Sequence, residues 1–332
     1  MVQSLRFATL DVFTTQPYSG NPLGVVFLPD SSSSSSSSPI TQEQKQLIAR
    51  EFNLSETIFI HPTNQSTPSS RAIDIFTTTE ELPFAGHPTI GAASWFLEHS
   101  SNEADKANVQ TLITKAGPFA ISRVPSSQSG DVAAKIAHNV HIHSSRFALS
   151  ELLRLHPSLV PFLNQSTSQD SFPVFSIVKG MSQVLVELPS LEALAATEAP
   201  MGGEDIPCKS VSEGGYLDAG WEGSGLIMVY FHVPGVLDES TGKKVIRSRM
   251  FLRNFEDPAT GSAASGLASY LALMGTDVGA TTEFDIVQGV EMGRRSDISV
   301  AVTVGAGGQE KKIETVELRG CAVKVTSGEL VI

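Results

Sequence analysis

The sequence predicts an α+β protein of two domains related by internal pseudosymmetry. Its 332 residues are more than a single hydrophobic core usually serves. Strand-like and helix-like segments recur along both halves, and the segment from Pro83 to Trp95 is repeated from Pro258 to Tyr270, an offset of 175 residues. We therefore expect domains at 1–125 and 126–332, separated by a Ser-, Pro- and Gly-rich linker, with the last strand able to pack back on the first domain.

Turn and capping residues delimit the elements of the first half. The turn chemistry of Ser19 to Pro22 predicts two strands within 11–27, and the Ser run 31–38 predicts a flexible surface loop. Thr41 with Gln44 is a capping-box signature, which predicts a helix that reaches about residue 50 and ends near Asn53. Strands over 57–60 and 72–76 and a helix from about His87 follow.

The second half also alternates predicted strands with a predicted helix. Its helix begins near Ser262, and its expected apolar stripe consists of Leu267, Tyr270, Leu271 and Met274. Strands are predicted near 137–142, 174–178, 184–188, 226–232, 245–252, 299–304 and 316–325.

Composition excludes several function classes. The net charge of −12 opposes binding to nucleic acid and to anionic membrane surfaces. We find no apolar run near the roughly 20 residues that a membrane helix needs, and no secretion signal at the N-terminus, so we expect a cytoplasmic protein.

Cysteine and histidine patterns give no metal centre. Cys208 and Cys321 stand apart and are expected to be inert thiols. His141 and His143 would share one face of a strand, but no third ligand or supporting acid is evident nearby. We therefore expect a solvent-facing strand and no metal.

The repeated segment predicts two anion sites. Each copy reads Pro-x-x-Gly, follows a strand and opens a helix, with Gly86 in the first copy and Gly261 in the second. Backbone N–H groups at a helix start bind anions, and glycine allows close approach of a ligand. The chain has no GxxxxGK[ST] lysine to accompany a phosphate, so a carboxylate is the expected ligand.

Polar side chains cluster in sequence around these openings. His87 follows Gly86, Ser262 follows Gly261, and Asp257 precedes the second copy. Together with Glu56 they could relay a proton, because burial and mutual interaction can bring a Glu pKa toward neutrality. Each residue also has an ordinary structural alternative: a solvated Glu, a polar helix start, an Asp-Pro turn and an N-cap.

At these residues the sequence resembles the phenazine-biosynthesis PhzF-like family, whose fold is that of diaminopimelate epimerase. The matching blocks follow the family's order over nearly the whole chain: Asp11-Val12-Phe13-Thr14, Gly20-Asn21-Pro22, Asn53-Leu54-Ser55-Glu56-Thr57, Leu82-Pro83-Phe84-Ala85-Gly86-His87-Pro88-Thr89, Glu256-Asp257-Pro258-Ala259-Thr260-Gly261-Ser262-Ala263, and Gln288-Gly289 with Gly293-Arg294.

The resemblance implies two domains, each a highly curved, mostly antiparallel sheet wrapped around a central helix, with the active site between them. It also implies homodimers, no cofactor, Glu56 as general acid/base, and a substrate carboxylate held at Gly86 and Gly261. His87, Asp257 and Ser262 match the family's other polar site residues. The best-known family reaction moves a proton along the conjugated system of a hydroxylated dihydroanthranilate.

Related epimerases and proline racemases carry a Cys immediately before each of these glycines, where this chain has Ala85 and Thr260. Without opposing thiols, a single carboxylate can still move a proton on one face of a π-system. We therefore expect a cofactor-independent isomerase acting on a small, conjugated or cyclic carboxylate. Two alternatives stay open: a non-catalytic member that binds a small molecule or a protein, and a different reaction on a conjugated metabolite.

Overall fold

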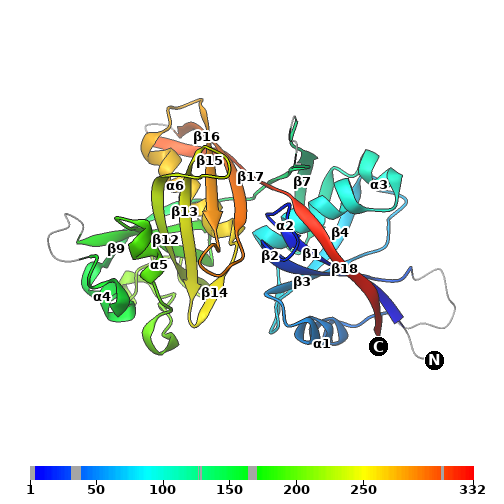
Figure 1. Ribbon diagram of the computed structural model, residues 1–332, viewed down its shortest axis with the longest axis horizontal. Coiled ribbons are helices and arrows are strands. Elements are labelled where there is room, and N and C mark those ends of the chain that lie inside the picture. Colours follow the sequence, from blue (N-terminus) through cyan, green and yellow to red (C-terminus); the bar gives the residue numbers. More distant parts are fainter. Residues whose placement is uncertain (1–3, 31–38, 126, 128, 164–169, 308–309) are drawn as a thin grey trace. The chain divides into compact units, whose positions relative to one another are not determined.

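A computed structural model describes residues 4–30, 39–125, 127, 129–163, 170–307 and 310–332. The chain forms two compact units, Met1–Ile136 with Leu318–Ile332, and Ala137–Glu317 (Figure 1). The Ser run 31–38 lies outside the described residues.

Unit 1 is a sheet-rich unit that both ends of the chain complete. Strand β18 pairs antiparallel with β1 along its whole length, so the last strand lies beside the first (Figure 1). Its elements are β1 (Ser4–Val12), β2 (Asn21–Phe27), α1 (Gln42–Phe52), β3 (Glu56–Ile60), β4 (Ser70–Phe76), β5 (Glu81–Leu82), α2 (Gly86–Ser94), the π-helix η1 (Trp95–His99), α3 (Glu103–Asn108), β6 (Thr111–Thr114), β7 (Gly117–Arg123), β8 (Val132–Lys135) and β18 (Ala322–Val331).

Unit 2 has its own set of strands and one long helix. Strand β17 (Glu310–Gly320) begins in this unit, and its last residues belong to unit 1. The other elements are β9 (His141–Ala148), α4 (Leu149–Leu155), η2 (Pro157–Leu159), β10 (Ser171–Val178), β11 (Met181–Glu187), α5 (Leu191–Ala196), η3 (Met201–Gly203), η4 (Val211–Glu213), β12 (Leu226–Leu237), β13 (Lys244–Leu252), β14 (Phe255–Asp257), α6 (Gly261–Gly275), β15 (Thr281–Gln288) and β16 (Ser296–Gly307).

The two units repeat one order of strand pairings. In unit 1, β1–β2 is antiparallel, β2–β3 parallel, β3–β4 and β4–β5 antiparallel, and then α2 precedes the parallel β4–β6 and antiparallel β6–β7 pairs. In unit 2, β10, β11, β12, β13, β14, α6, β15 and β16 follow the same sequence of directions. The internal repeat predicted from the sequence is confirmed by this shared topology, as is the pseudo-symmetric, mostly antiparallel fold.

Each unit contains one largely buried helix, α2 in unit 1 and α6 in unit 2. All nine residues of α2 are buried, and it contacts β1, β2, β3 and β18. Helix α6 contacts β10, β11, β15 and β16 and is buried from Gly261 to Ser269. Small residues make this possible, because Gly, Ala and Ser let a helix approach strands on every side. The first residues of both helices are therefore buried within their units.

Short sequence motifs predicted the bounds of helix α1 correctly. The predicted capping box of α1 is present: Thr41 Oγ1 accepts the N–H of Gln44, and Gln44 Oε1 accepts the N–H of Thr41. Asn53 caps the other end in the left-handed region, with φ of 51°. The expected helix boundaries are therefore confirmed.

Three expectations for the second half differ from the structure. The strand expected near 137–142 begins only at His141, after an irregular segment that follows β8. Met274, placed in the buried stripe of α6, is 57% exposed, because the buried side of this helix is carried by alanines. The strand expected at 316–325 is broken at Cys321, between β17 and β18.

Within the described residues, no helix combines the length and apolar character needed to span a bilayer. Cys208 and Cys321 form no disulfide. Burial, followed by the charge of Asp205, raises the pKa of the Cys208 thiol, which agrees with the expected low reactivity.

Candidate active site

The start of α2 in unit 1 presents backbone N–H groups without a side-chain cap. Its N-cap residue is Ala85, which has no side-chain oxygen, and Gly86 and His87 are the first two helical residues. Pro88 fits the first turn because its missing N–H would have had no partner inside the helix. The positive end of this helix is therefore suited to an anion.

Glu56 is the first residue of β3, and its side chain contacts the start of α2. Its Oε2 lies 3.2 Å from His87 Nδ1, and the side chains of Glu56 and His87 are 17% and 3% exposed. Ser55, the preceding residue, donates a hydrogen bond from Oγ to Asn21 Oδ1 at 3.4 Å. Two motif blocks far apart in the sequence thus hold the segment that carries Glu56.

The ionised form of Glu56 is favoured in this setting. Burial raises the pKa of Glu56, but the charge and hydrogen bond of His87, together with a hydrogen bond from Ser55, outweigh it and lower the pKa below its ordinary value. The sequence had suggested a shift toward neutrality, and the structure gives the opposite direction. Sequence reasoning missed this because it could not place the imidazole against the carboxylate.

His87 has one nitrogen left for another group. Its Nδ1 faces Glu56, whereas its Nε2 is buried and has no hydrogen-bond partner among the described residues. A buried polar atom without a partner is rare and points to a functional contact. His87 can therefore contact a ligand while it holds Glu56.

The start of α6 in unit 2 holds the other predicted site residues, Asp257, Gly261 and Ser262. Thr260 is the N-cap, but its side chain does not cap the helix. Instead, Thr260 Oγ1 donates to Asp257 Oδ2 at 2.6 Å, so the first turn of α6, with Gly261 and Ser262, keeps its N–H groups free of a side-chain cap. Asp257 and Ser262 are both buried, at 8% and 9% exposure.

Gln288, at the end of β15, forms hydrogen bonds with the residues at this helix start. Its Nε2 donates to the carbonyl oxygen of Asp257 at 2.7 Å and to Thr260 Oγ1 at 3.1 Å. Its Oε1 accepts the hydroxyl of Tyr230 at 3.1 Å and the N–H of Thr260 at 3.3 Å. One fully buried amide thus fixes both the backbone and the side chains of the Asp257 turn.

The backbone conformation at position 289, directly after Gln288, requires glycine. Its φ is 74°, and a Cβ there would lie 2.6 Å from the carbonyl oxygens of both Pro258 and Arg294. Only glycine lets β15 end this close to the turn before α6. The Gln288-Gly289 pair was visible as a motif, but its bonds to Thr260 and Tyr230 were not predicted.

The predicted site residues thus form two groups. Glu56, Gly86 and His87 lie together in unit 1, and Asp257, Gly261 and Ser262 lie together in unit 2. The convergence of the two groups on one cleft, and their chemical roles, stay predictions.

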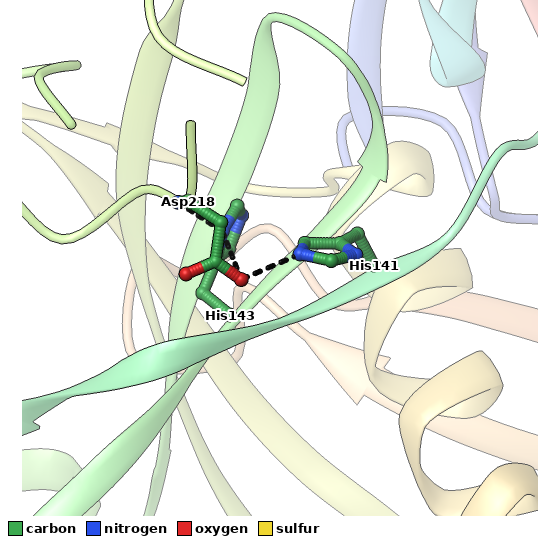
Figure 2. Close-up of side chains that lie close together, drawn as sticks. All are labelled: His141, His143 and Asp218. Carbon is green, nitrogen blue, oxygen red and sulfur yellow. Dashed lines mark hydrogen bonds and ion pairs between the residues drawn. The ribbon is translucent and has the colours of Figure 1, made fainter. Parts of the chain in front are cut away.

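A separate polar cluster corrects the sequence analysis at His141 and His143. The two were expected on a solvent-facing strand without a third ligand, but Asp218 lies beside both, and the three residues could hold a metal ion (Figure 2). His143 is 3% exposed. The sequence did not reveal Asp218 because the segment that carries it is distant along the chain.

Comparison with known proteins agrees with this architecture. The family model described as "Phenazine biosynthesis-like protein" matches residues 10–328. An uncharacterized isomerase of Mesorhizobium japonicum is 30% identical over the full length of both chains. The trans-2,3-dihydro-3-hydroxyanthranilate isomerase of Pseudomonas chlororaphis is 30% identical, covering 98% of this chain and 99% of its own.

Solved structures share the fold. A PhzF-family phenazine biosynthesis protein of Bacillus anthracis aligns with a TM-score of 0.68 at 20% identity, covering 99% of this chain and all of the other. A hydroxyproline epimerase from Agrobacterium vitis aligns with a TM-score of 0.56 at 12% identity, covering 99% and 93%. On its sequence match and its fold, this chain belongs to the phenazine biosynthesis-like (PhzC-PhzF) family.

Proposed function

We propose that the protein is a cofactor-independent isomerase that moves a proton on a small conjugated or cyclic carboxylate, with Glu56 as the proton carrier. The contact between His87 and Glu56 at the uncapped start of α2 carries this proposal. The isomerase names of relatives that match this chain end to end support the reaction class.

The first step is removal of a proton from carbon. Glu56 is ionised at neutral pH because its pKa is lowered, so its carboxylate can accept that proton. The electron pair left on carbon spreads over the conjugated system of the substrate. Glu56, now a carboxylic acid, returns the proton to another carbon of the same system, which regenerates the carboxylate and leaves an isomer of the substrate.

Binding of the substrate carboxylate is assigned to the two helix starts. Gly86 and Gly261 each open a helix whose first turn has no side-chain cap, and such N–H groups bind anions. In this proposal the two groups face one cleft. His87 Nε2 would contact the substrate, the Ser262 hydroxyl would donate to a substrate oxygen, and Asp257 would serve as the second carboxylate of the site.

The residues before the glycines favour a one-base reaction. Ala85 has no ionisable group, and the Thr260 hydroxyl is engaged with Asp257. A two-base inversion at a single carbon would need a proton carrier on each face of the substrate. A one-carboxylate proton shift fits the groups that are present.

Exchange of deuterium from D₂O into substrate tests the assignment. As the probe we choose trans-2,3-dihydro-3-hydroxyanthranilate, the acid named for the Pseudomonas chlororaphis relative. Replacement Glu56→Gln should slow exchange by about 10²- to 10⁴-fold with little change in binding, the usual range for loss of one general acid/base. Glu51→Gln, at an exposed position of α1, is the matched control and should exchange like the wild type. Retained exchange in Glu56→Gln would overturn the role of Glu56.

A further inference from the structure

Two histidines of β9 and an aspartate from a distant loop form a compact donor cluster in unit 2. His141 and His143 are two residues apart on β9, with Ile142 between them, so both side chains lie on one side of the strand. Asp218, in the loop before β12, reaches between them, with Oδ2 at 2.7 Å from His141 Nε2 and 4.0 Å from His143 Nδ1 (Figure 2). The three ligand atoms all lie within 4.8 Å of one another.

The hydrogen bonds of His143 define its tautomer. The backbone N–H of Asp218 donates to Nδ1 at 3.0 Å, so Nδ1 carries a lone pair and Nε2 carries the proton. Nε2 lies 2.8 Å from Ser176 Oγ, which in turn lies 2.6 Å from Ser182 Oγ. A neutral imidazole whose Nε2–H is held by a polar group keeps its lone pair on Nδ1, the nitrogen nearer to the Asp218 carboxylate, and such a held N–H is typical of a metal-ligating histidine.

This tautomer argues against a hydrolase triad at the same place. Asp218, His143 and Ser176 stand in the order of such a triad, but a general base would need a lone pair on the nitrogen that faces the serine. Here that nitrogen carries the proton, and Ser176 is fully buried.

Trp221 shields one side of the cluster and leaves the other accessible. Its indole stacks on the His141 ring at 4.8 Å between centroids, with an interplanar angle of 12°, and meets the His143 ring edge-on at 5.8 Å. The side chains of His141 and Asp218 remain 33% and 26% exposed. An ion can therefore reach the cluster from solvent, and an aromatic ring lies close enough to report its arrival.

We propose that His141, His143 and Asp218 form a binding site for a transition-metal ion of the Zn²⁺ type. Ligand atoms of tetrahedral Zn²⁺ lie about 3.4 Å apart, since each bond is about 2.0–2.2 Å long. The distances of 2.7 and 4.0 Å from Asp218 to the two histidines bracket this spacing, so small side-chain rotations suffice. Two imidazole nitrogens and one carboxylate suit Zn²⁺, Co²⁺ or Ni²⁺ better than Mg²⁺ or Ca²⁺.

Coordination would join the loop at Asp218 to β9. The ion would take the Nδ1 lone pair of His143 in place of the Asp218 N–H, and water would complete its shell. None of the three residues belongs to the groups around α2 and α6, so the site is separate from the proposed isomerase chemistry.

Titration of the chelator-treated full chain with Zn²⁺, and with Co²⁺ for its visible absorption, tests the proposal. We expect one ion per chain, a change in Trp221 fluorescence, and binding at least about tenfold weaker in Asp218→Asn and in His141→Gln. Isomerase activity should be the same in these variants as in the wild type. Mg²⁺ should not compete.

The matched control is His61→Gln in unit 1. His61 also pairs with an aspartate, with Nε2 at 2.8 Å from Asp74 Oδ2 and a similar side-chain exposure of 35%, but among the described residues this pair belongs to no three-ligand cluster. This variant should bind Zn²⁺ like the wild type. The proposal is overturned if the wild type takes up no Zn²⁺ or Co²⁺ at micromolar concentrations, or if binding is unaffected by His141→Gln. It is likewise overturned if binding falls equally in His61→Gln. His141→Gln serves as the deciding variant should Asp218→Asn not fold, because His141 is partly exposed.

Discussion

Replacement Thr260→Val should loosen the start of α6 without changing its shape. Valine keeps the volume of threonine but lacks the hydroxyl, which donates to Asp257 Oδ2 at 2.6 Å and accepts from Gln288 Nε2 at 3.1 Å. A hydrogen bond to a charged group contributes about 1.5–3 kcal/mol and a neutral one about 0.5–1.5 kcal/mol. Gln288 keeps its second bond, to the carbonyl oxygen of Asp257, so we expect a loss of about 2–4 kcal/mol in the free energy of unfolding of unit 2.

Urea denaturation followed by tryptophan fluorescence measures this loss. The chain has two tryptophans, Trp95 in unit 1 and Trp221 in unit 2, so a Trp95→Phe background reports on unit 2 alone. Thr260→Ser, which keeps the hydroxyl, is the matched control and should lose less than half as much. The reasoning is refuted if serine is as damaging as valine, or if Thr260→Val unfolds within about 0.5 kcal/mol of the wild type, the range of ordinary surface changes.

Two further predictions concern buried charge in unit 2. Burial lowers the pKa of His232 to about 4, so the folded state resists its protonation. As pH falls from about 6.5 to 4, the free energy of unfolding of the wild type should drop by about 3 kcal/mol more than that of His232→Gln. Equal loss in both proteins, measured by urea titration at each pH, would contradict this. Arg249 binds both carboxylate oxygens of Glu256, at 2.7 and 2.9 Å, and the carbonyl of Thr197. Arg249→Met should therefore destabilise by about 3–5 kcal/mol, chiefly because Glu256 loses its counter-charge. Adding Glu256→Gln should recover part of this loss but not all of it, since the Thr197 carbonyl contact then stays broken; no recovery in the double variant would contradict that cause.

Features that depend on nearby residues were predictable from the sequence. The capping box of α1 involves residues three apart, and the Gly-led starts of α2 and α6 were visible as a repeat, so both were located correctly. The duplicated order of strand pairings follows from the same repeat. Local chemistry and internal duplication together thus predicted most of the fold.

Features that depend on distant contacts were not predictable. The sequence could not show that His87 would lower the pKa of Glu56, because the two residues meet only when α2 packs against β3. Asp218 was missed as the neighbour of His141 and His143 because a long segment separates them. Met274 was misplaced because apolar periodicity does not reveal that alanines suffice to bury a helix enclosed by strands.

The central proposal is that the helix starts at Gly86 and Gly261 bind the same substrate carboxylate. Amide NMR of the ¹⁵N-labelled chain during titration with the dihydroanthranilate probe tests it most directly. We predict that the N–H signals of Gly86 and Gly261 shift together, with one common Kd and saturation at one ligand per chain. A shift of only one of the two glycines, two different Kd values, or no shift of either signal would contradict the shared site.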